Sequence, residues 1–132
     1  MENEAKKVVN EFLTAVQHGD TQKLAALMHP NVEWSQPGNN SISGIKRSSA
    51  EVFQMVGKMY ELSDNTLMLT SIKSIGVNGN SVACLINWTA AQPSGGVLNV
   101  DNIDVYTVEK GQITKVNIFT ADETKENQFW GA

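Results

Sequence analysis

The stretch from Val97 to Asp122 limits the possible folds of this 132-residue chain more than any other feature. Apolar and polar residues alternate there with a period of two on both sides of Glu109–Gln112, and Val, Ile, Thr, Tyr and Phe are frequent. Successive side chains of a β-strand point to opposite faces, so this alternation indicates two strands, and the glycine between them favours a tight connection. The sequence therefore predicts a long β-hairpin.

The first strand of this hairpin has two unlike faces. One face consists of Asn102, Asp104 and Tyr106, and the other of Ile103, Val105 and Thr107. Charged residues are mostly exposed, so the polar face could simply meet water. Alternatively, the polar face lines a cavity, and a partner chain covers the apolar face. The alternation alone leaves both interpretations open.

The first half of the chain has the residue spacing of helices. Apolar residues recur three or four positions apart, as on the buried side of an amphipathic helix, in residues 4–17, 21–28 and 50–61. Gly19, Asp20 and Pro30 supply the stop, start and stop signals of the first two helices. A short extended segment, Val32–Trp34, is expected before the third.

After Ser63 the pattern predicts strands at 66–77 and 81–92, before the hairpin described above. The polar tail from Thr124 to Ala132 is expected to dock through Phe129 and Trp130, because free ends rarely carry aromatic residues without burying them. Helices followed by antiparallel strands are typical of an α+β fold. We therefore predict one domain over residues 1–132, in which a curved, cone-shaped sheet wraps around three N-terminal helices and leaves room for a cavity.

The loop from Ser35 to Gly44 is dense in residues that favour turns. It offers little apolar area that could hold it against the rest of the protein. We therefore predict that it is the most mobile internal segment and that it borders the entrance of the cavity.

Charge and hydropathy make several partners improbable. The net charge is −4, and basic residues occur at most in adjacent pairs, so neither nucleic acid nor an anionic membrane surface is expected as a partner. The apolar runs are far shorter than the ~20 residues that span a bilayer. No secretory signal is visible in the sequence, and we expect a cytoplasmic protein.

The scarcity of cysteine and histidine limits the chemistry. Cys84 is the single cysteine, and its apolar surroundings indicate a buried, inert thiol. The two histidines, His18 and His29, lie where helices are expected to end, and a solvated side chain is the simpler interpretation of each. A metal site and a nucleophile activated by histidine both need more ligands or partners than these residues supply, so no metal is expected.

The order of these elements and motifs resembles that of the nuclear transport factor 2-like superfamily. The likeness rests on the order of five features. These are a first helix that ends at Gly19-Asp20, a second helix, the segment Val32-Glu-Trp34 with a Pro-Gly loop, a third helix, and the run Asp-Val-Tyr-Thr-Val-Glu-Lys-Gly-Gln-Ile that begins at Asp104. The branch most similar in pattern contains the SnoaL-like polyketide cyclases and the ketosteroid isomerases. This resemblance implies a cone-shaped, cystatin-like α+β barrel, a pocket between helices and concave sheet face, no cofactor, and a homodimer.

The resemblance also implies roles for particular residues. Asp104 matches the aspartate that points inward in the isomerases and stays protonated to hold an oxyanion, which favours the cavity interpretation of its face. The tyrosine that the isomerases carry on the first helix falls at Phe12, and their general-base aspartate falls at about Trp34, so steroid isomerisation is not expected. Asp122 is the best-placed substitute carboxylate, although a solvated aspartate at a strand end is the alternative. The candidate catalytic residues are thus Asp104 and Asp122.

Six further residues are candidates for binding a ligand: Trp34, Tyr60, Asn87, Asn102, Tyr106 and Thr120. The aromatic members could stack on a flat ligand or simply belong to the core. Ile103 and Val105 are assigned to the outer face of the sheet, together with Val82, Cys84, Ile86 and Trp88. Because an exposed apolar patch of this extent is rare in monomers, these residues predict a homodimer through the convex side of the sheet.

Two functions from different classes remain. The first is a SnoaL-like pocket protein for a compact, largely apolar, possibly cyclic organic ligand, with one ligand oxygen near Asp104; as an enzyme it would catalyse a cofactor-free isomerisation, cyclisation or hydration. The second is a non-catalytic ligand-binding or protein-association domain. The first function requires a buried Asp104, whose pKa desolvation would raise above the usual ~3.9.

Overall fold

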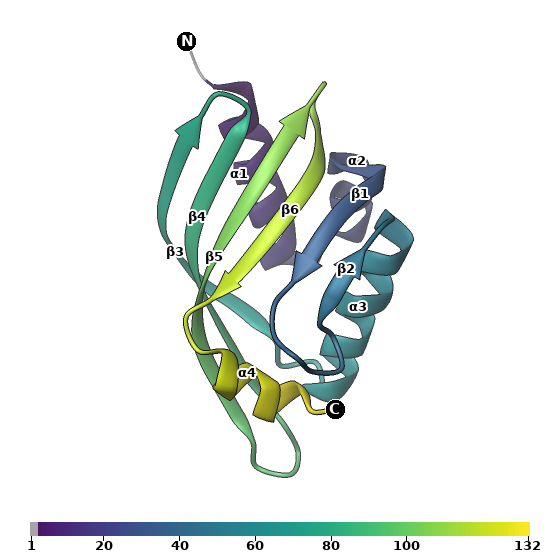
Figure 1. Ribbon diagram of the computed structural model, residues 1–132, viewed down its shortest axis with the longest axis vertical. Coiled ribbons are helices and arrows are strands. Elements are labelled where there is room, and N and C mark those ends of the chain that lie inside the picture. Colours follow the sequence, from purple (N-terminus) through teal and green to yellow (C-terminus); the bar gives the residue numbers. More distant parts are fainter. Residues whose placement is uncertain (1–2) are drawn as a thin grey trace.

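The structure is a computed structural model that describes residues 3–132, so the first two residues of the predicted domain lie outside the described part. It contains four helices and six strands (Figure 1). In chain order they are α1 (Glu4–His18), α2 (Thr21–Leu27), β1 (Met28–Gln36), β2 (Gly44–Lys46), α3 (Ser49–Leu62), β3 (Met68–Asn78), β4 (Ser81–Ala91), β5 (Val97–Glu109), β6 (Gln112–Thr120) and α4 (Glu123–Trp130).

The six strands form one mixed sheet in the order β2-β1-β6-β5-β4-β3. Strand β1 runs parallel to β6, and the other neighbours are antiparallel. Because β2 and β3 are free edges, the curved sheet does not close into a complete barrel. Helix α1 packs against β3 to β6, and α3 packs against β1 and β2 (Figure 1). The predicted α+β fold is confirmed, with the helices on the concave face of the sheet.

Side-chain caps account for the starts of the three N-terminal helices. Asn3, Asp20 and Ser48 each accept a hydrogen bond from the backbone N–H three residues later, which satisfies one of the free donors of the first turn. Helix α1 ends at Gly19, whose φ of 66° lies in the left-handed region that favours glycine. These boundaries agree closely with those expected from the sequence.

Strand β1 is longer than predicted, and β2 was not predicted at all. The second helix ends at Leu27, so Pro30 lies inside β1 and does not end the helix. The parallel pairing of β1 with β6, in which Trp34 is opposite Val116, joins segments about eighty residues apart in the chain. Pairing with a distant strand needs no alternation within β1 itself, which is why the sequence showed only Val32–Trp34 as extended.

The predicted orientation of β4 is wrong. Cys84 is opposite Asp104 in the β4–β5 ladder, and directly opposed residues point to the same face of a sheet. Val82, Cys84, Ile86 and Trp88 therefore point to the concave side with Asp104, and the first three are fully buried. The turn at residues 92–96 sets this register through hydrogen bonds between Gln92 and the glycines that follow it. Alternation alone does not reveal which face of β4 points inward.

The C-terminal tail forms a helix that the sequence analysis did not predict. Helix α4 lies across the end of the sheet, beside the loop that joins β1 and β2 (Figure 1). Phe129 and Trp130 are buried and pack edge to face, with ring centroids 4.8 Å apart. The expected docking of the tail through these two aromatic residues is confirmed.

The loop between β1 and β2 is attached to this helix. The Asn127 side-chain oxygen accepts hydrogen bonds from the Asn39 backbone N–H at 2.8 Å and from the Asn40 side chain at 2.9 Å. Ser41 donates hydrogen bonds to the backbone carbonyls of Trp130 and Gly131, and Ile42 is buried. The loop is therefore held by hydrogen bonds to α4, a helix that was not expected, and by the burial of Ile42, although it offers little apolar area.

None of the helices in residues 3–132 is both long and apolar enough to cross a bilayer.

Candidate functional site

A cavity of about 450 Å³ lies between the helices and the concave face of the sheet. This volume falls within the range typical of small-molecule sites. All four helices contribute to its walls, which are mainly apolar. Representative apolar side chains are Phe12, Leu24, Met28, Met55, Met59 and Leu98. Several methionines among them suit irregular ligands, because the unbranched thioether side chain adapts its shape.

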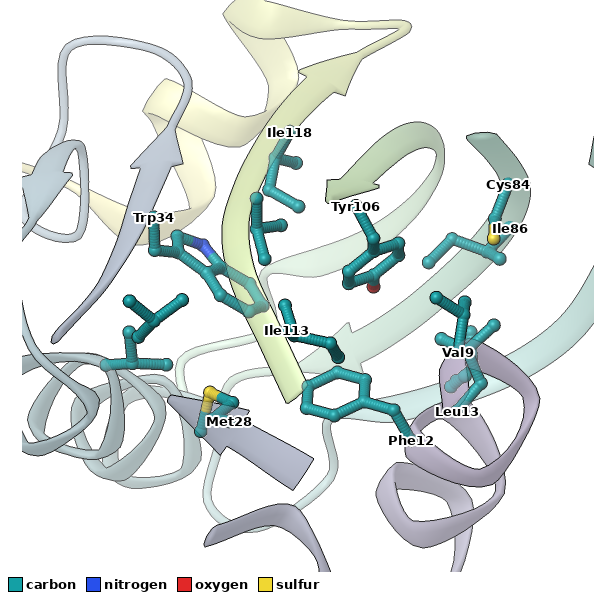
Figure 2. Close-up of a cluster of buried hydrophobic side chains, with 14 of the residues drawn as sticks. Val9, Phe12, Leu13, Met28, Trp34, Cys84, Ile86, Tyr106, Ile113 and Ile118 are labelled. Carbon is teal, nitrogen blue, oxygen red and sulfur yellow. The ribbon is translucent and has the colours of Figure 1, made fainter. Parts of the chain in front are cut away.

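Aromatic side chains from three elements pack together at the wall of this cavity. The Phe12 ring from α1 lies between Trp34 of β1 and Tyr106 of β5, with centroid distances of 6.5 Å and 5.7 Å (Figure 2). The Trp34 indole N–H donates to the Gln36 side-chain oxygen at 2.9 Å, which fixes the orientation of the ring. Trp34 and the predicted Tyr60 both line the cavity, whereas Tyr106 lies buried behind the lining.

Three polar side chains meet at one end of the cavity. Asn102 and Asp104 point inward from β5, and Glu126 comes from α4; their exposed fractions are 5%, 3% and 4%. The Tyr106 hydroxyl donates a hydrogen bond to Asp104 Oδ2 at 2.9 Å. Within residues 3–132, no protein group bonds to Asp104 Oδ1, Asn102 Oδ1 or Glu126 Oε2. The Asn102/Asp104 face thus borders the cavity and not the solvent.

Burial changes the acidity of these groups. Desolvation raises the pKa of Asp104 to about 7, against the hydrogen bond from Tyr106 that lowers it, and the nearby charge of Glu126 raises it further. The raised pKa expected for Asp104 therefore agrees with the structure. Desolvation also raises the pKa of Glu126, while Thr120 and Trp130 oppose that rise. The Cys84 thiol behind the pocket has its pKa raised by burial to about 12, which keeps it protonated and inert.

Three predicted site residues lie away from the cavity. Strand β6 ends at Thr120, and the chain then turns outward, so Asp122 is exposed and accepts a hydrogen bond from the Lys125 backbone N–H as the N-cap of α4. Its predicted position on the pocket face is wrong. Thr120 does not border the cavity and instead lies near Glu126. Asn87 is on the convex side of the sheet, where its amide bonds to Asp101.

The lining residues that were not predicted from the sequence include Gln36, Trp88, Glu126 and Trp130. Trp88 was missed because of the wrong face assigned to β4. The positions of Glu126, Phe129 and Trp130 differ by three and four residues, which is the spacing of one helical face. This spacing was the available signal for α4 and for a carboxylate on the same face as two aromatic residues. The described residues 3–132 contain no group of three His, Cys, Asp or Glu side chains placed to hold a metal ion.

Comparison with known families agrees with this geometry. The model of the SnoaL-like domain matches residues 9–116, which is most of the chain. The chain belongs to the SnoaL-like domain family. The resemblance inferred from the sequence motifs is confirmed. The match ends inside β6, so helix α4 with Glu126 lies outside the matched segment.

Solved structures show the same fold. A protein of unknown function with a cystatin-like fold from Xanthomonas campestris is 34% identical, with a TM-score of 0.92 over 97% of this chain and 98% of that one. TerC, co-crystallised with polyporic acid, is 15% identical, with a TM-score of 0.84 over 98% of this chain and 99% of that one. A putative SnoaL-like polyketide cyclase from Jannaschia sp. CCS1 is 17% identical, with a TM-score of 0.79 over 99% of this chain and 94% of that one. At such low identity, the last two show likeness of fold alone.

Proposed function

We propose that this single SnoaL-like domain binds a compact, largely apolar, cyclic organic molecule in the cavity and transfers protons on it as a cofactor-free isomerase, cyclase or hydratase. The observation that supports this most is the buried Asp104, whose Oδ1 has no partner among the described residues at the end of an apolar cavity. A cytoplasmic location remains part of the same proposal.

The apolar walls and Asp104 would recognise different parts of such a ligand. A buried polar atom without a partner costs roughly 1–3 kcal/mol, and a ligand atom that bonds to it recovers this cost. Because the pKa of Asp104 is about 7, the carboxyl group keeps its proton where an exposed aspartate has lost it. It can then donate a hydrogen bond to a ligand carbonyl or enolate oxygen. The polyporic acid bound to TerC supports an organic molecule as the ligand of this fold.

Binding of β-tetralone, a bicyclic ketone, and of tetralin, the same skeleton without oxygen, tests this role. Trp34, Trp88 and Trp130 line the cavity, so quenching of tryptophan fluorescence reports binding. We expect both molecules to bind, and Asp104→Leu to weaken β-tetralone about tenfold because one hydrogen bond is lost. Asp104→Asn keeps a donor and should bind β-tetralone as the natural protein does.

Tetralin is the control for the shape of the cavity in each variant. Asp104→Leu should bind tetralin at least as well as the natural protein, because no polar contact is involved. Equal loss of both molecules in Asp104→Leu would mean that the substitution deforms the cavity. Unchanged β-tetralone binding in Asp104→Leu would refute the role of Asp104.

We also propose a homodimer through the convex face, which keeps Ile103 and Val105 of the predicted interface but not the β4 residues, since these point inward. Leu85, Ile103 and Phe119 are opposed across three neighbouring strands and form an apolar row on that face. Ile103 and Phe119 are 49% and 50% exposed, and Val105 extends the row. A second copy of the chain would bury this row, which also suits the alternative function of a non-catalytic association domain.

Substitution of Ile103 by lysine tests the dimer. A charge at the centre of an interface of ~800 Å² per partner would be desolvated without a counter-ion, so the variant should be monomeric at low micromolar concentration. Light scattering should give twice the 14.4 kDa chain mass for the natural protein and the single mass for Ile103→Lys. Val97→Lys, at a 70% exposed position outside the row, should remain dimeric. A natural protein of single mass would contradict the proposal.

A further inference from the structure

Glu126 has the burial and surroundings of a functional carboxylate. It lies in the first turn of α4, borders the cavity and is 4% exposed. The Trp130 indole N–H donates to Oε1 at 3.4 Å, whereas Oε2 has no partner within residues 3–132. Glutamate is almost never buried unless it is paired. The helix position and the bond from Trp130 account for a carboxylate here, but they leave Oε2 without a protein partner among the described residues.

The ionisable groups that border the cavity are few. Among the described lining residues they are Tyr60, Asp104 and Glu126. Tyr60 comes from α3, whereas Asp104 and Glu126 are close enough for the charge of Glu126 to act on the pKa of Asp104. A proton acceptor for a bound molecule must therefore be one of these two carboxyl groups.

The neighbouring groups indicate which of the two carboxyl groups accepts a proton and which donates a hydrogen bond. The first turn of a helix favours negative charge, and Glu126 also has Thr120 and Trp130 beside it, both of which favour its charged form. Asp104 has Tyr106 as its single donor within residues 3–132 and lies beside Cys84, its direct partner in the β4–β5 ladder. These neighbours favour Glu126 as the proton acceptor of the pair and Asp104 as the hydrogen-bond donor.

We propose that Glu126 is the general base of this pocket and that the substrate is a cyclic ketone with an acidic C–H bond beside its carbonyl. This proposal rests on the proposed function, in which Asp104 binds the substrate oxygen. It replaces Asp122 as the second catalytic carboxylate. Glu126 enters from a helix outside the matched family segment, whereas position 34, where the isomerases resembled by the sequence carry their base, is occupied by Trp34.

The proposed step moves one proton and no other atom. The C–H bond breaks, its proton bonds to Glu126 Oε2, and its electron pair forms the carbon–carbon double bond of an enolate. The charge on the enolate oxygen is stabilised by the hydrogen bond donated by protonated Asp104. Where the substrate carries a further double bond beside that carbon, the enolate is conjugated with it. Return of the proton from Glu126 to the far carbon of that double bond then shifts the double bond and completes an isomerisation, and no oxidant, reductant or metal is consumed.

Exchange of β-tetralone hydrogens with deuterium in heavy water measures this step directly. The hydrogens between its carbonyl and its aromatic ring are the acidic ones, and their loss is followed by proton NMR. We expect the natural protein to accelerate exchange over buffer, and Glu126→Gln to lose about a hundredfold or more of that acceleration, which is the usual contribution of a general base. Binding, followed by tryptophan fluorescence, should be retained in Glu126→Gln.

The matched control is Glu123→Gln, in the same helix turn but exposed, which should exchange β-tetralone at the natural rate. Full acceleration by Glu126→Gln, or binding without acceleration by the natural protein, would overturn the assignment of Glu126 while leaving the binding role of Asp104 intact. Binding of tetralin but not of β-tetralone would overturn the ketone class. Binding of neither would overturn the proposed function itself.

Discussion

Replacing Asp104 with asparagine is expected to stabilise the protein at alkaline pH and to flatten its pH profile. The pKa of Asp104 is about 7 in the folded protein and about 3.8 in the unfolded chain, so the folded state binds the proton more tightly. The natural protein therefore loses stability as the pH rises from about 4 to about 7. At ~1.4 kcal/mol per pKa unit, the loss is on the order of 4 kcal/mol. Asparagine cannot ionise and avoids it.

Urea unfolding at a series of pH values measures this effect. The free energy of unfolding of Asp104→Asn, relative to the natural protein, should increase steadily between about pH 4 and pH 7 and stay level above that. A smaller slope of the same sign should remain in the variant, because burial also raises the pKa of Glu126. Asp64→Asn, at an exposed position, should follow the natural profile. A difference between Asp104→Asn and the natural protein that is independent of pH would refute the raised pKa.

Replacing Trp130 with alanine is expected to cost about 3–5 kcal/mol of unfolding free energy, as for other buried tryptophans. Trp130 is 3% exposed, packs edge to face on Phe129 and borders the cavity. Its backbone carbonyl accepts a hydrogen bond from the Ser41 hydroxyl, so a weakened α4 also loosens the loop between β1 and β2. Equilibrium denaturation measures the loss, and amide exchange at Ser41 should become faster.

The exposed Gln128 on the same helix provides the matched control. Gln128→Ala should change the unfolding free energy by less than about 0.5 kcal/mol, as surface substitutions usually do. A loss below about 1 kcal/mol in Trp130→Ala would mean that α4 contributes little to the fold. The pocket would then be open at that end, and the burial of Glu126 would not be maintained in solution.

The correct and incorrect predictions for β4 and β5 have a common physical origin. Period-two alternation showed which residues share a face of one strand, and it grouped Asn102, Asp104 and Tyr106 correctly. It contains no information about which of the two faces points inward. For β5 the family resemblance supplied that choice. For β4 the choice depends on the register set by the turn after Gln92, and Asn87 and Trp88 were consequently assigned to the wrong sides.

Residues near the C-terminus illustrate a second limit. Asp122 continues the alternation of β6, and only the outward turn of the chain after Thr120 reveals it as a helix cap. Glu126 appeared to be one charged residue of a polar tail. Its burial depends on α4 packing across the end of the sheet, with bonds from Asn127 to a loop nearly ninety residues earlier in the chain.

The sequence by itself determined the fold class, the three N-terminal helices, the long hairpin and the inward position of Asp104, because these follow from local spacing, capping and family motifs. The tertiary structure alone decided the register of β4 against β5, the parallel pairing of β1 with β6 and the position of α4. These features depend on contacts between residues far apart in the chain, and the periodic pattern of one segment does not indicate its partner or its register. The placement of Glu126 beside Asp104 is of this second kind, since the two carboxyl groups are brought together only when α4 closes the end of the cavity.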